Sequence, residues 1–228
     1  MPILTILFEK LRCMLRNYVP QLSSQIEALP SDIPDRMVEY AFVLRELNAT
    51  SGRVLDVGCT SPYNVIPLIL ADQNLEVWGI DVRRFKVRHP NFRFCLGDIT
   101  HTTFPDSYFD RIIAVSTIEH IGLRGRYTSK GDSIGDRRAM LEIARILKKN
   151  GSVLVTVPFG RSKTADASHR VYDALKLREL VRGLVVSKEE YYVKDKSGYW
   201  LQCDSANAES IDASGGEYPV ACLKLLKP

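Results

Sequence analysis

Two aspartates stand at the ends of apolar runs, where the sugar of a nucleotide-like ligand could bind. Asp56 lies within the run 54–57, which Gly58 closes, and Asp81 directly follows the apolar run 77–80. The carboxyl ends of parallel strands meet at one edge of a sheet, so Asp81 should lie beside the turn at Gly58. A carboxylate in that place can accept hydrogen bonds from both hydroxyls of a ribose.

A histidine after another strand could remove a proton from an acceptor molecule. The apolar run 109–116 ends shortly before Glu119 and His120. Imidazole has an ordinary pKa near ~6.5 and therefore exchanges protons at neutral pH. His120 is the first candidate for a general base, and His169 in a later loop is the alternative. The other interpretation of His120 is a histidine that only packs beneath the ligand.

Two loops concentrate cations near the same end of the predicted sheet. The loop 121–135 contains four glycines, and the loop 159–170 follows the next strand. Together they predict an anionic acceptor such as a phosphate, a nucleotide-linked sugar or a uronate, because lysine and arginine bind such groups. Charged loops are also common as solvated surface, so that alternative stays open. The candidate substrate-binding residues are Arg124, Arg126, Lys130, Arg161 and Arg170.

The elements that must position these residues alternate along the chain. From Gly52 onward, short β-branched runs alternate with helix-like segments, which predicts a mostly parallel sheet with helices on both faces. Strands are expected near 54–57, 77–80, 92–96, 109–116, 151–157 and 218–226, with helices at about 35–47, 136–148 and 172–182. Residues 1–50 are predicted to be a helical accessory segment, and residues 51–228 the ligand-binding domain.

Composition limits the class of protein. The chain has 228 residues, 45% of them hydrophobic and 25% charged, as in an ordinary globular domain. Its five cysteines are scattered without metal-ligand spacing, which argues against zinc and disulfides and favours a cytoplasmic location. A net charge of +4 gives no strong nucleic-acid signal.

The N-terminal segment has a helical apolar face but is too short to cross a bilayer. Apolar residues at helical spacing between positions 3 and 15 predict a helix packed on the domain or at a dimer contact. A weaker alternative is a helix on a membrane surface, because Lys10, Arg12 and Arg16 could meet acidic lipids. A monomer and a homodimer both agree with this pattern.

The ordered set of motifs resembles class I S-adenosylmethionine-dependent methyltransferases. The set comprises the turn at 54–59, the acids Asp81 and Asp98, the segment 104–110 before a strand, and 145–158. The resemblance implies a Rossmann-like, doubly wound α/β fold. It also implies three α/β/α layers, with a seven-stranded, mostly parallel sheet and an antiparallel last strand.

The resemblance further implies a cofactor, S-adenosylmethionine, and places its contacts. Asp56 and Gly58 would frame the methionine end, Asp81 the ribose and Asp98 the adenine, while 116–119 would line the methyl side. The implied cofactor-binding residues are Asp56, Gly58, Cys59, Thr60, Asp81, Val82, Asp98, Ile99, Ser116 and Glu119. Similar glycan-modifying members favour O-methylation of a small anionic or sugar-type acceptor.

One departure from the family keeps alternatives open. Thr60 and Pro62 stand where the family carries glycines, and a side chain at Thr60 narrows the approach of a ligand. The alternatives are a methyltransferase with a neutral natural-product acceptor and a non-catalytic binding domain of the same fold. A nicotinamide-binding domain fits less well, because it would need glycines beside a pyrophosphate.

Overall fold

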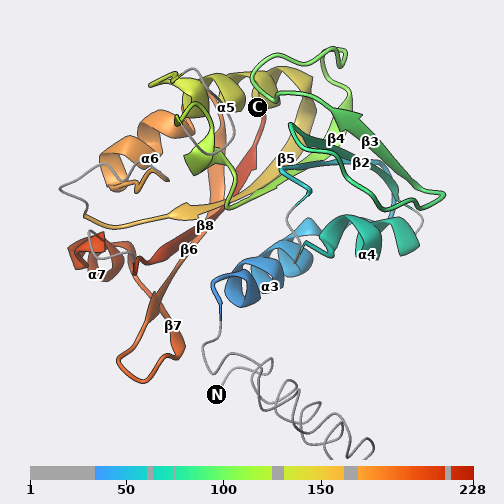
Figure 1. Cartoon of the computed structure of the whole chain (residues 1–228). Coiled ribbons are helices and arrows are strands. Elements are labelled where there is room, and N and C mark those ends of the chain that lie inside the picture. Colours follow the sequence, from blue (N-terminus) through green and yellow to red (C-terminus); the bar gives the residue numbers. More distant parts are fainter. Residues whose placement is uncertain (1–33, 61–63, 74, 125–130, 162–168, 214–216) are drawn as a thin grey trace, which may run out of the picture. The chain divides into compact units, whose positions relative to one another are not determined.

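The computed structural model describes residues 34–60, 64–73, 75–124, 131–161, 169–213 and 217–228. Within these ranges, eight strands form one sheet in the order β3-β2-β1-β4-β5-β8-β6-β7 (Figure 1). The strands are β1 (Arg53–Val57), β2 (Glu76–Asp81), β3 (Phe92–Leu96), β4 (Phe109–Val115), β5 (Leu147–Pro158), β6 (Val185–Lys194), β7 (Trp200–Cys203) and β8 (Val220–Leu226).

The sheet has a parallel and an antiparallel part. The strands β3, β2, β1, β4 and β5 pair in parallel, whereas β8 pairs antiparallel with both β5 and β6. The strand β7 closes the sheet as the antiparallel partner of β6. The predicted α/β fold class is confirmed, and β7 adds an eighth strand to the seven that were expected.

Helices cover both faces of the sheet, so the three-layer arrangement is confirmed (Figure 1). The helices α3 (Arg36–Leu47) and α4 (Ile66–Asp72) pack on one face, in a core that includes Phe42, Ile66 and Ile113. On the other face lie α5 (Gly135–Ile146) and α6 (Ala174–Leu180). The short helices η2 (Ile118–His120) and α7 (Ser205–Ser210) complete the described elements.

The central strands explain why the sequence folds this way. The strand β1 is buried from Val54 onward, with Val54 in the core under α3 and α4, and Leu55 in the core under α5. Side chains of a strand alternate between faces, so a strand covered on both sides must be apolar almost throughout. Asp56 interrupts this run and is buried nonetheless.

Two boundaries differ from the sequence prediction. The helix α5 ends at Ile146, and β5 begins at Leu147, although the sequence predicted helix up to 148. The early start follows from pairing, because Leu147 lies opposite Phe109 before a shift in register between Phe109 and Arg111. The chain turns at Asn150, whose φ of 60° asparagine tolerates better than most residues.

Contacts divide the chain into Met1–Pro34 and Asp35–Pro228. The helix α3 belongs to the second unit, although its residues fall within the predicted accessory segment 1–50. The predicted amphipathic helix between positions 3 and 15 lies outside the described residues, and the proposed domain boundary stays a prediction. Among the residues that the structure describes, no helix is long and apolar enough to cross a membrane.

Candidate functional site

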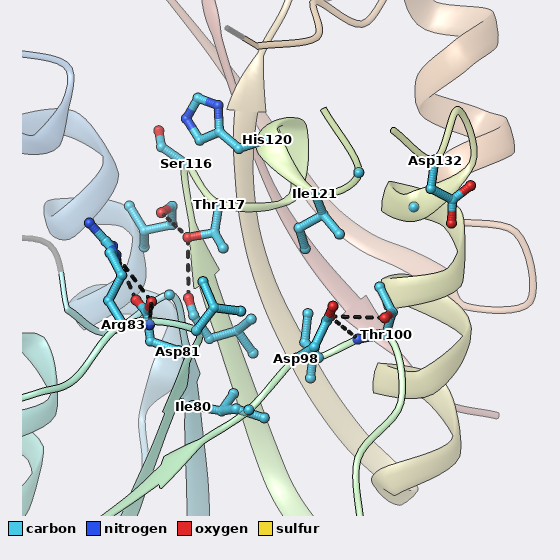
Figure 2. A pocket seen from close by; sticks show the side chains of 18 of the residues that line it. Ile80, Asp81, Arg83, Asp98, Thr100, Ser116, Thr117, His120, Ile121 and Asp132 are labelled. Atoms are coloured by element: carbon cyan, nitrogen blue, oxygen red, sulfur yellow. Dashed lines mark hydrogen bonds and ion pairs between the residues drawn. The ribbon is translucent and has the colours of Figure 1, made fainter. Parts of the chain in front are cut away.

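A pocket of about 440 Å³ opens at the carboxyl ends of β1, β2, β3 and β4 (Figure 2). Ligands of open α/β sheets bind at this edge. At one side, the aspartate end, lie Asp81 and Asp98; at the other, the histidine end, lie Ser116 and His120. Its walls also include Arg36, Gly58, Ile80, Val82, Arg83, Ile99, Thr100, Thr117, Ile121, Gly122 and Asp132.

The turn after β1 is fixed by a contact that only glycine permits. Gly58 has a φ of 78°, and a Cβ atom there would lie 2.3 Å from the Thr117 hydroxyl oxygen. That hydroxyl lies 3.2 Å from the carbonyl oxygen of Val57 and 2.9 Å from that of Val115. The ends of β1 and β4 are therefore joined through Thr117, which lines the pocket and belongs to the range 116–119 that was expected on the methyl side.

Asp81 is the most heavily hydrogen-bonded acid of the aspartate end. Its Oδ2 accepts from the Thr60 backbone N–H at 3.1 Å and from the Thr60 hydroxyl at 2.6 Å. Arg83 donates its backbone N–H and Nε to Oδ1, and its Nη2 to Oδ2 (Figure 2). Burial alone would raise the pKa of Asp81, but the hydrogen bonds from Arg83 and Thr60 lower it below its ordinary value.

Asp98 lines the pocket and is held by hydrogen bonds within its own turn. Its Oδ1 accepts the Thr100 backbone N–H at 2.8 Å and the Thr100 hydroxyl at 2.9 Å (Figure 2). Ile80, Val82 and Ile99 add apolar surface to the lining of the pocket. An acid together with apolar surface suits a heteroaromatic ring that carries hydrogen-bond donors.

The other residues predicted around the first turn lie behind the pocket wall. Asp56 is buried, accepts a hydrogen bond from Asn64 at 2.6 Å, and has its pKa raised to about 7 by burial. Cys59 is buried in the core under α3 and α4, and Thr60 turns its hydroxyl to Asp81. Their roles as direct cofactor contacts stay predictions, whereas Gly58, Asp81, Val82, Asp98, Ile99 and Ser116 line the pocket.

The histidine end rests on a buried acid that the sequence analysis missed. Glu39 of α3 is fully buried, and its Oε1 accepts from the hydroxyls of Ser116 and Thr156, each at 2.6 Å. Its other oxygen forms an ion pair with Arg36, which lines the pocket. Ser116 has a φ of 40°, a strained value for serine, and the hydrogen bond from its hydroxyl to Glu39 helps to hold this conformation.

Glu119 and His120 lie side by side in η2 but in different surroundings. His120 lines the pocket, with its side chain 12% exposed, and its Nε2 lies 3.5 Å from Glu119 Oε1. Glu119 is buried, and burial raises its pKa to about 8. The carboxyl of Glu119 therefore lies beneath the site, although the sequence analysis expected it among the cofactor contacts.

His169 and Tyr218 extend the histidine end. The ring centroids of His120 and His169 are 6.4 Å apart, and those of His169 and Tyr218 are 5.1 Å apart. The two histidines proposed as alternative bases are thus neighbours, although 49 positions separate them in the sequence. Burial raises the pKa of Tyr218, and the acids Asp35, Glu119 and Glu39 add to that effect.

Two of the predicted substrate-binding cations, Arg161 and Arg170, donate hydrogen bonds to backbone carbonyls. Arg170 donates Nη1 to the Ile121 carbonyl at 2.6 Å and Nη2 to the Asp132 carbonyl at 3.2 Å, and it lies 3.5 Å from Asp136. Arg170 thereby links Ile121, which follows η2, to Asp132, which precedes α5, and its role as an acceptor ligand stays a prediction. Arg161 donates to the Ser210 carbonyl.

Arg124 is exposed and passes over Gly131, at the border of the described loop. Arg126 and Lys130 lie outside the described residues. Arg36 is a cation that does line the pocket, and the sequence offered one signal for it. Asp35, Arg36 and Glu39 follow the spacing of a helix cap and an i,i+3 ion pair, but nothing in that pattern points to a site 80 residues away.

Comparison with known proteins identifies a family model and similar structures. A model described as "Caenorhabditis protein of unknown function, DUF268" matches residues 81–207. The structure of the [4+2]-cyclase SpnF is similar with a TM-score of 0.60 and 19% identity, over 84% of this chain and 80% of SpnF.

Two further similar structures come from bacteria. A 1,6-didemethyltoxoflavin-N1-methyltransferase of Burkholderia thailandensis, with bound S-adenosylhomocysteine, has a TM-score of 0.55 at 12% identity, over 96% of this chain and 89% of its own. A putative S-adenosylmethionine-dependent methyltransferase of Listeria monocytogenes has a TM-score of 0.56 at 11% identity, over 85% of this chain and 100% of its own. The fold is therefore that of class I methyltransferases.

Proposed function

Since the chain belongs to the DUF268 family, whose function its description leaves open, we propose from the site that it is an S-adenosylmethionine-dependent methyltransferase. The observation that carries the proposal is one pocket that joins Asp81 and Asp98, at consecutive strand ends, to His120. Acids at the ends of β2 and β3 suit the ribose and the adenine of the cofactor. His120 suits an acceptor that must lose a proton.

The residues present fit this cofactor in size and charge. A volume of about 440 Å³ lies within the range of small-ligand sites. Asp81 would hold the ribose, Asp98 and Ile99 the adenine, and Gly58 the methionine part. The pocket lining contains three acids, Asp81, Asp98 and Asp132, and two arginines, Arg36 and Arg83. Such a lining suits a ligand with a net positive charge better than a pyrophosphate.

When bound, S-adenosylmethionine supplies an electrophilic methyl group, so the protein has to orient an acceptor and remove its proton. We infer O-methylation of a small anionic or sugar-type acceptor. Arg36 of α3 supports this, since it is a cation among the residues that line the pocket.

A second candidate is a binding domain that performs no methyl transfer. The observation that favours it is the pair of Arg83 and Thr60, whose hydrogen bonds already engage both oxygens of Asp81. A ribose can take this acid only by displacing some of those donors. The similar structure of a [4+2]-cyclase also comes from a protein named for another reaction.

Titration calorimetry of the purified chain separates the two candidates. S-adenosylmethionine and S-adenosylhomocysteine should both bind, and NAD should not, because Thr60 and Pro62 stand where a pyrophosphate-binding turn would need glycines. Mass spectrometry should then detect a gain of one methyl group on members of a panel of uronates and sugar phosphates. Binding of neither adenosyl ligand would refute the proposal. Binding without transfer to anionic or neutral acceptors would favour the binding domain.

A further inference from the structure

Glu119 has a buried carboxyl that the structure leaves half unsatisfied. Its side chain is 2% exposed. Among the described residues, its Oε2 has no hydrogen-bond partner. A buried polar atom without a partner costs free energy, so such atoms are rare and often mark functional groups. Its other oxygen, Oε1, lies 3.5 Å from His120 Nε2.

The surroundings of Glu119 disfavour its charged form. Glu39, a second buried acid nearby, already has Arg36 and two hydroxyls as partners. Two desolvated carboxylates close together repel, so one of them keeps its proton. Burial, together with Glu39, raises the pKa of Glu119 to about 8, while Arg36 acts against this. The charged and titratable groups that face the pair of Glu119 and His120 are Asp35, Arg36, Glu39, His169, Arg170, Tyr172 and Tyr218.

We infer that Glu119 is a positioning residue for His120, with which it shares one proton and whose imidazole it orients at the histidine end of the pocket. The inference rests on the proposed methyltransferase function. It reassigns Glu119 from the cofactor to the base, because the Oε1 atom of its buried carboxyl lies beside His120 Nε2. Glu119 does not touch the ligand pocket itself, because it is absent from the residues that line it.

The chemistry of the pair follows from the proton count. The acceptor O–H bond breaks and its proton forms an N–H bond on His120, while the oxygen electron pair forms the bond to the methyl carbon. The sulfur–methyl bond breaks at the same time, and its electron pair stays on sulfur. An ionised Glu119 beside His120 stabilises the imidazolium that results. The pair is therefore competent once it has lost its shared proton, which requires mildly alkaline pH.

Nuclear magnetic resonance can follow this proton without a known acceptor. The sequence has four histidines, so each ring signal can be assigned by replacing His89, His101, His120 and His169 in turn. In the parent protein, the His120 signal should report two proton losses, the later one near pH 8, because coupled groups titrate as a pair. In Glu119→Gln, the His120 signal should show a single step.

Two variants keep the experiment decisive. Glu119→Asp retains a carboxyl and should restore the second step at least in part, whereas Glu179→Gln alters an exposed acid paired with Arg137 and should leave His120 unchanged. A second step that persists in Glu119→Gln would assign the coupling to His169 and overturn the inference. A single step already in the parent would do the same. If Glu119→Gln does not fold, the comparison of parent with Glu119→Asp decides, since shortening the acid must alter the second step.

The binding of S-adenosylmethionine tests the proposed function separately. Glu119→Gln should bind S-adenosylmethionine within about twofold of the parent, because Glu119 lies outside the pocket lining. No binding by parent and variant alike would refute the methyltransferase, whatever the histidines do. Binding together with an uncoupled His120 would refute only the role of Glu119. With an acceptor in hand, the rise of kcat toward alkaline pH should be lost in Glu119→Gln while KM for the cofactor stays the same.

Discussion

The two ends of the pocket hold their acids by opposite means. At the aspartate end, Asp81 and Asp98 accept hydrogen bonds from residues no more than 21 positions away. At the histidine end, Glu39 accepts from residues 77 and 117 positions away. The pKa of Asp81 is lowered, whereas the pKa of Glu119 is raised. Hydrogen bonds from nearby turns thus favour the charged form of Asp81, whereas burial favours the protonated form of Glu119.

The contrast explains how acids in and beneath one pocket can have different tasks. A carboxylate that binds sugar hydroxyls must be ionised, and the donors of Thr60 and Arg83 favour that form. A group that exchanges protons near neutral pH needs a shifted pKa, which burial supplies at Glu119. The aspartate end should therefore tolerate changes in α3, and the histidine end should not.

Glu39→Ala tests the dependence on α3 most severely. The change leaves Arg36 without its buried partner and removes the acceptor of two hydroxyls, so unfolding free energy should fall by about 3–5 kcal/mol. Urea denaturation measures the loss. The matched control is Glu179→Ala, which removes an exposed ion pair with Arg137 and should cost less than about 1 kcal/mol. Equal losses in both variants would contradict the importance of Glu39.

Asp81→Ala tests the aspartate end. Loss of a charge-assisted contact to the ribose should weaken S-adenosylmethionine binding by about 1.5–3 kcal/mol, measured by calorimetry. Asp72→Ala removes an acid whose side chain is 76% exposed and that lies at the far end of α4, and it should bind like the parent. Unchanged affinity in a folded Asp81→Ala protein would remove the cofactor from this end of the pocket.

The pH dependence of stability separates the ends in a third way. The folded-state pKa of Glu119, about 8, lies above its unfolded value, so the folded state binds the extra proton. The extra proton stabilises the folded state fully at pH values below the unfolded pKa. This stabilisation is lost as the pH rises toward 8, and the free energy of unfolding falls by at most about 1.4 kcal/mol per pH unit. Glu119→Gln cannot ionise and should become relatively more stable than the parent between pH 5 and 8, judged by urea midpoints. If the urea midpoints of the two proteins change in parallel with pH, Glu119 is already ionised at pH 5 in the folded state.

Arg83→Ala should give the smallest effect, and the direction of the change is informative. If the guanidinium only competes with the ribose for Asp81, its removal should strengthen S-adenosylmethionine binding by about two- to fivefold. The backbone donors of Thr60 and of residue 83 would remain. Arg84→Ala is the control, since Arg84 is exposed and not among the pocket-lining residues. Weaker binding in Arg83→Ala alone would mean that Arg83 holds the ligand instead.

The sequence predicted those features that short, continuous segments encode. Alternating apolar runs and helices gave the parallel part of the sheet, and the acids at strand ends placed Asp81 and Asp98 at one edge. His120 lies at that edge as well. The helix predicted from about 35 to 47 corresponds to α3.

The sequence could not predict contacts that arise only when distant segments pack. Nothing in the spacing of Arg36 and Glu39 links them to Ser116 and Thr156, because the link exists only once α3 packs on the sheet. The strand β7 escaped prediction because it is short and shows no regular alternation of buried and exposed positions. Arg83 reads as a surface residue until its guanidinium is seen against Asp81.

The position of β8 between β5 and β6 sets the order in which a growing chain can complete its sheet. The strands β5 and β6 are both synthesised before β8. In the described sheet, however, β6 is connected to β5 through β8, and β8 pairs with seven residues of β5. Until Val220–Leu226 has left the ribosome, β5 keeps an open edge, and unpaired strand edges promote aggregation. Slow translation between β6 and β8 should therefore lower the yield of folded protein more than an equal delay before β1.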